Sequence, residues 1–61
     1  MPTIFLNMLE GYDQEKKEKM VQRVTDAVVE SLGVVPEKVS VFIQEYSANN
    51  VARNGVTYNK Q

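Results

Sequence analysis

Apolar residues follow different patterns in different parts of the chain. Between Thr3 and Leu9 they occupy neighbouring positions, which predicts a strand that is apolar, and therefore covered, on both faces. Between Gln14 and Leu32 they recur at every third or fourth position, which predicts a helix with one apolar stripe. The stripe consists of Met20, Val21, Val24, Ala27, Val28 and Leu32.

A second strand is predicted from Val39 to Tyr46, where residues alternate between two faces. One face carries Val39, Val41 and Ile43, and the other carries Ser40, Phe42, Gln44 and Tyr46. Between Val51 and Tyr58, the dipeptide Asn54-Gly55 separates two short β-prone pieces, which predicts a hairpin. Asp13 is typical of a helix N-cap, and Gly33 lies where a left-handed C-cap is expected.

Strand, helix and strand form a β-α-β unit with a parallel pair of strands, so the expected fold class is α/β, with a single domain over residues 1–61. Such a unit has a helix for only one face of its sheet. The other face, which carries Phe42 and Tyr46, would lie in water. A chain of this length buries only about 60% of its unfolded surface. We therefore expect self-association, with the C-terminal hairpin contacting a neighbouring subunit.

Composition excludes several classes of function. The chain has 7 Lys plus Arg against 8 Asp plus Glu, a net charge of −1, which argues against nucleic-acid binding because that would need a basic stripe. It has no Cys and no His, which removes disulfides and the usual zinc ligands. We expect neither a metal nor a cofactor.

Localisation follows from absent signals. Asn7 and Glu10 interrupt the first apolar run, so no signal peptide is predicted. No apolar stretch approaches the ~20 residues that span a bilayer. The expectation is a cytoplasmic protein without a membrane partner.

The dipeptide Met1-Pro2 precedes the first strand directly. Removal of an initiator Met before Pro would leave a secondary amine at the edge of an apolar strand. A free α-amino group titrates near ~8, and apolar surroundings lower that pKa because they disfavour the charged form. Such an amine can act as a general base. The alternative is that Met-Pro is only a start residue followed by a strand-compatible one.

Short motifs follow one another in order along essentially the whole chain: Met1-Pro2, Leu9-Glu10-Gly11, Asp13–Lys17, Val24–Val28, Val41–Glu45 and Asn50–Val56. Together they resemble the motifs of the 4-oxalocrotonate tautomerase family. The resemblance implies a hexamer built as a trimer of dimers, most simply from one kind of chain. It also implies catalysis by Pro2, freed of Met1, on a small carboxylate substrate. Arginines from neighbouring subunits are implied to hold the carboxylate and polarise the carbonyl.

The chain departs from the family at several site positions. Tyr12 and Ser40 stand where the family typically has arginines, and Val51 replaces a bulky aromatic residue. Tyr12 and Ser40 can each donate a hydrogen bond but supply no charge. Arg53 lies in the hairpin that covers a neighbour's site in the family, where it would form a carboxylate clamp. The alternative for Arg53 is an exposed cation or an interface ion pair.

Two functions stay open at this point. The first is a tautomerase for small unsaturated or aryl 2-keto or 2-hydroxy acids. In it Pro2 transfers the proton, Arg53 holds the carboxylate, Ser40, Tyr12 or amides near Leu9 contact the keto oxygen, and Val51 keeps the site dry. The second is a scaffold subunit with little or no activity, for instance in a mixed hexamer with a related chain. Arg23, the chain's other arginine, lies off the helix stripe and is expected at the surface.

Overall fold

Two parallel strands form the centre of the protein. The computed structural model describes residues 1–61 and has β1 at Thr3–Leu9 and β2 at Ser40–Tyr46, paired in register from Thr3–Ser40 to Leu9–Tyr46. The first strand and the parallel pairing are as predicted. The second strand begins one residue later than expected, because the N–H of Val39 is bonded to the carbonyl of Pro36 (3.0 Å) in a 3₁₀ turn, Pro36–Lys38.

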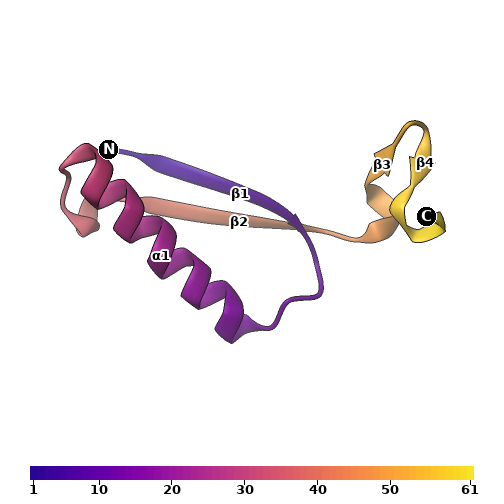
Figure 1. Ribbon diagram of the computed structural model, residues 1–61, viewed down its shortest axis with the longest axis horizontal. Coiled ribbons are helices and arrows are strands. Elements are labelled where there is room, and N and C mark those ends of the chain that lie inside the picture. The colour runs from indigo at the N-terminus through magenta and orange to yellow at the C-terminus, as the bar shows by residue number, and fades with distance from the viewer.

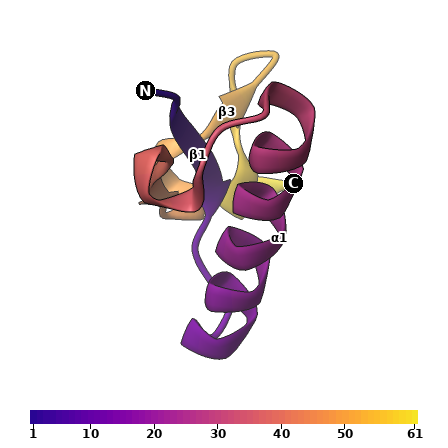
Figure 2. The ribbon, with the colours of Figure 1, turned by 90° about the vertical axis from the view of Figure 1, so that its left-hand side faces the viewer.

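The helix α1, Gln14–Leu32, has the predicted bounds. Its N-terminus is capped by the Asp13 carboxylate, which accepts a hydrogen bond from the backbone N–H of Lys16 at 2.8 Å. Gly33 ends it in the left-handed conformation (φ 69°) and donates its N–H to the carbonyl of Val29. Figures 1 and 2 show α1 lying along one side of the strand pair.

The apolar stripe of α1 differs slightly from the prediction. Val29 and Thr25 are half-buried, together with Met20, Val21, Val24 and Val28. Ala27 and Leu32 are exposed instead. Ala27 lies at the edge of the stripe, and Leu32 belongs to the last turn, where nothing in this chain covers it.

A small hairpin follows β2 after a 3₁₀ turn, Ala48–Asn50. It pairs β3, Ala52–Arg53, with β4, Val56–Thr57, in antiparallel register. Asn54 and Gly55 connect them with positive φ angles of 56° and 77°, the type I′ geometry that the dipeptide predicted. A last 3₁₀ turn, Tyr58–Lys60, ends the chain. The hairpin projects from the end of the sheet opposite the N-terminus (Figure 1).

The chain alone has no buried core, since none of its 61 residues is fully buried. The sheet face toward α1 carries half-buried Ile4, Leu6, Val41 and Ile43. On the other face Phe5 and Phe42 stack with ring centroids 5.4 Å apart, yet they are 69% and 56% exposed. This is the uncovered face that the sequence predicted. No helix has the length and apolarity needed to cross a membrane.

Candidate functional site

Pro2 lies at the start of the sheet, directly before β1. It is half-buried, while Met1 is 90% exposed. The carbonyl of Pro2 accepts a hydrogen bond from the N–H of Ser40 at 3.1 Å, so parallel pairing brings these two predicted site residues together. Ser40 itself is exposed, and strand alternation places its side chain on the same face as Phe42.

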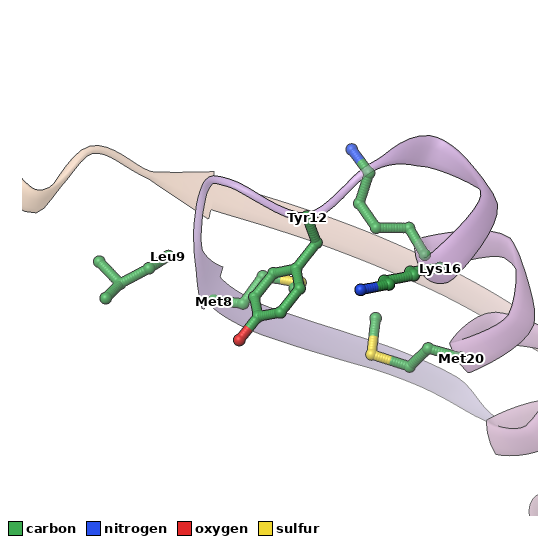
Figure 3. Close-up of a pocket in the computed structure, with 6 residues that line it drawn as sticks. Met8, Leu9, Tyr12, Lys16 and Met20 are labelled. Atoms are coloured by element: carbon green, nitrogen blue, oxygen red, sulfur yellow. The ribbon is translucent and has the colours of Figure 1, made fainter.

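Leu9 and Tyr12 lie at the other end of β1. Together with Met8, Lys16, Lys17 and Met20 they line a pocket of about 340 Å³ between β1 and the first turns of α1. Figure 3 shows the Tyr12 ring over this pocket, with the Met8 and Met20 sulfur atoms and the Lys16 side chain around it. Tyr12 is 58% exposed, and its hydroxyl has no hydrogen-bond partner within the chain.

The two lysines of this pocket differ in their charge environment. Lys17 Nζ lies 3.0 Å from Glu45 Oε1, an ion pair that ties the first turn of α1 to the end of β2. Lys16 forms no ion pair. The pocket is therefore apolar with one free ammonium group at its rim, which suits a small anion with an apolar body.

The hairpin carries Val51 and Arg53. Val51 is half-buried, and its carbonyl accepts the N–H of Tyr58 at 2.8 Å. Arg53 is exposed, has no acidic partner, and places its guanidinium carbon 5.8 Å from the centre of the Tyr58 ring. Its N–H groups are thus available to an outside anion. Arg23 is exposed on α1, as expected for a surface residue.

Within one subunit these residues do not form one site. Pro2 and Ser40 lie at one end of β1 and β2, and Leu9 and Tyr12 at the other, about 20 Å away for a seven-residue strand. The hairpin with Arg53 extends further in the same direction, along a molecule 43 Å long (Figure 1). Pro2 can meet Arg53 only if a second subunit supplies one of them.

Metal binding has no support in the side chains that are present. No three acidic side chains gather closely enough to hold an ion, and the chain has neither His nor Cys.

Two residues, Lys16 in the pocket and Tyr58 in the hairpin, were not singled out as site residues from the sequence. Lys16 precedes Met20 by four residues on α1, so the helix period places the two side chains on one face, and both line the pocket. Tyr58 contacts Arg53 across the hairpin. The only signal for that contact was the Asn-Gly turn, which brings the two ends of the hairpin together.

The fold is a small β-α-β unit with a C-terminal hairpin and an uncovered apolar sheet face. Comparison with known proteins agrees with this fold. A family model described as "Tautomerase enzyme" matches residues 2–61. A probable tautomerase of Bacillus cereus is 42% identical over 55 residues, covering 90% of each chain. The 2-hydroxymuconate tautomerase of Bacillus subtilis is also 42% identical over 55 residues, covering 90% of this chain and 89% of the relative.

Solved structures agree as well. YwhB, a homologue of 4-oxalocrotonate tautomerase, superposes with a TM-score of 0.94 at 37% identity, covering 98% of both chains. A 4-oxalocrotonate tautomerase isozyme from Methylibium petroleiphilum gives 0.93 at 36% identity, covering 97% of this chain and 92% of the other. The chain belongs to the 4-oxalocrotonate tautomerase family.

Proposed function

We propose that the protein is a tautomerase that interconverts the enol and keto forms of small unsaturated or aryl 2-keto and 2-hydroxy acids, with Pro2 as acid and base. The observation that carries this proposal is the family match, which starts at Pro2 and extends to the last residue. Met1 is almost fully exposed, so its removal would cost no packing and would free the Pro2 nitrogen.

The chemistry needs one group that moves a proton. The neutral nitrogen of Pro2 takes the proton from the enol hydroxyl, the C–O bond becomes a carbonyl, and the displaced electron pair passes through the conjugated system. The terminal carbon of that system then takes the proton back from the Pro2 nitrogen. No atom or electron is gained overall, so Pro2 returns to its neutral state at the end of each turnover.

The active unit in this proposal is an oligomer, with a homohexamer as its simplest form. Exposed Phe5 and Phe42 and the lack of any buried residue support it, because the chain alone has no core. Assembly would bring the hairpin of one subunit to Pro2 of another. Arg53 then holds the substrate carboxylate through the paired N–H groups of its guanidinium.

The remaining predicted residues would line the same composite site. Val51 and Leu9, both half-buried, provide apolar walls that keep water away from the amine. Ser40 or Tyr12, which are both exposed, or amides near Leu9 donate a hydrogen bond to the keto oxygen. Neutral donors stabilise a developing enolate less than a guanidinium would.

A second candidate function is a subunit with little activity in a mixed hexamer. Ser40 and Tyr12 favour it, because they supply hydrogen bonds but no charge at positions where the family resemblance places arginines. In that case a related chain would bring the missing cations.

The experiment that tests the proposal is ketonisation of phenylenolpyruvate and 2-hydroxymuconate by protein whose intact mass shows that Met1 is absent. We expect turnover, and a loss of roughly 10²–10⁴-fold in kcat for Pro2→Ala. Pro36→Ala, which changes the chain's only other proline, is the matched control and should keep its activity. Met1-free protein that is silent on both acids would overturn the tautomerase proposal and favour the mixed assembly.

A further inference from the structure

The hairpin contains a cation and an aromatic ring in contact. The guanidinium carbon of Arg53 lies 5.8 Å from the centre of the Tyr58 ring, within the range in which a cation is attracted to an aromatic face. Arg53 forms no ion pair, and its contact with Tyr58 is the one cation–aromatic contact in the chain.

The ring belongs to a well-fixed part of the hairpin. The N–H of Tyr58 donates to the Val51 carbonyl at 2.8 Å, and Tyr58 is half-buried although it lies near the end of the chain. Tyr58 also begins the last 3₁₀ turn, in which its carbonyl accepts the N–H of Gln61 at 3.1 Å. The ring is therefore held more firmly than the exposed arginine beside it.

Contact with a ring face has a particular consequence for a guanidinium. Its five N–H donors lie in the plane of the group and point away from its own face. The Tyr58 ring, 5.8 Å from the guanidinium carbon, restricts the long side chain, and no hydrogen bond within the chain uses these donors. A carboxylate can then bind at the edge in the paired geometry, and less rotamer entropy is lost on binding.

We propose that Tyr58 is a positioning residue that holds Arg53 ready for a carboxylate. This inference rests on the proposed function and adds to it a residue that acts only through Arg53. The Tyr58 hydroxyl makes no hydrogen bond in the chain, so the aromatic ring, and not the hydroxyl, is the group that positions Arg53.

The test compares Tyr58→Leu, which removes the ring, with Tyr58→Phe, which keeps it, in Met1-free protein. With phenylenolpyruvate as substrate, we expect Tyr58→Leu to raise KM by roughly two- to fivefold. kcat should change little, because the carboxylate contact is the same in the ground and transition states. Tyr58→Phe should resemble the unmodified protein. In an Arg53→Met background, Tyr58→Leu should have no further effect on KM.

One measurement needs only the unmodified protein, so it stays decisive if Tyr58→Leu folds poorly. The δ-methylene protons of Arg53 should show an upfield ring-current shift in NMR spectra, and its absence would overturn the inference. Where Tyr58→Leu does fold, titration with benzoate is a second readout and should show weaker binding than to Tyr58→Phe.

Failure of the inference and failure of the proposed function give different results. Active unmodified protein with equal KM values for the Leu and Phe variants would overturn only the role of Tyr58. If Tyr58→Leu raised KM just as much in the Arg53→Met background, the role of Tyr58 would also be overturned, because the ring would then act through the general structure and not through Arg53. Unmodified Met1-free protein that neither turns over the acid nor binds benzoate would overturn both.

Discussion

At the scale of single residues, the proposed chemistry depends on the protonation state of one nitrogen. Pro2 must be neutral to accept a proton, and a free α-amino group titrates near ~8, lower in apolar surroundings. Below that pKa the nitrogen is protonated and cannot act as the base, and above it the nitrogen is competent.

We therefore expect kcat/KM to fall by about tenfold for each pH unit on the acid side of the Pro2 pKa, and to level off above it. The measurement is a pH profile of phenylenolpyruvate ketonisation at constant ionic strength. The chain has no His, so no histidine can produce such a limb near neutral pH. A flat profile between pH 5 and pH 8 would contradict a role for the amine as base.

Some features of the candidate site could be predicted from single residues of the sequence, and others could not. Pro2 was singled out because loss of Met1 would free its nitrogen beside an apolar strand and because motifs along the whole chain resemble the family, and its catalytic role stays a prediction. The strand register that places Ser40 beside Pro2 was not predicted, and the hydrogen bond from the Ser40 N–H to the Pro2 carbonyl reveals it. The contact between Arg53 and Tyr58 could not be derived, since it depends on the rotamers of two side chains. Which subunit faces Pro2 depends on contacts that no single chain contains.

At the scale of elements, the ends of the helix are determined by short-range interactions. The Asp13 carboxylate accepts the N–H of Lys16 at 2.8 Å and lies at the positive end of the helix dipole. Asp13→Ala should lower the free energy of unfolding by about 1 kcal/mol, as is usual for loss of an N-cap. The measurement is urea unfolding at one fixed protein concentration, because assembly makes stability depend on concentration.

The matched control for the cap is Glu30→Ala, which removes a carboxylate from an exposed position later in α1. The Glu30 side chain makes no hydrogen bond or ion pair, so the free energy of unfolding should change by no more than about 0.5 kcal/mol. Equal destabilisation by the two substitutions would show that the cap contributes nothing specific.

Local signals of this kind explain why the elements could be predicted so closely. Asp13, Gly33 and Asn54-Gly55 each act on their own turn, and the structure has a cap, a left-handed residue and a hairpin at these positions. The two errors have different causes. Val39 is taken into the local 3₁₀ turn that Pro36 begins, where the start of the strand was expected. Leu32 is apolar but lies beyond what the sheet covers, which depends on tertiary contacts.

At the scale of the whole molecule, the exposed sheet face is the main constraint. Phe5 and Phe42 stack on each other and yet expose 69% and 56% of their surface, in a chain without a single fully buried residue. Burial of one such side chain contributes roughly 1.5–3 kcal/mol. That amount is large for so short a chain, whose stability otherwise rests on half-buried contacts between α1 and the sheet. Association through this face would supply the missing core.

Phe42→Glu should therefore abolish both assembly and cooperative folding, because a carboxylate would have to be buried without a partner where a ring was stacked. Sedimentation should show a shift to the monomer, and circular dichroism a loss of the thermal transition. Ser31→Glu adds the same charge at an exposed position on α1 and should leave both unchanged. An assembly of unaltered size and thermal midpoint in Phe42→Glu would mean that subunits join elsewhere. A different interface would then have to bring Pro2 to the hairpin of a neighbouring subunit. Within one subunit, the length of the strands separates Pro2 from the hairpin.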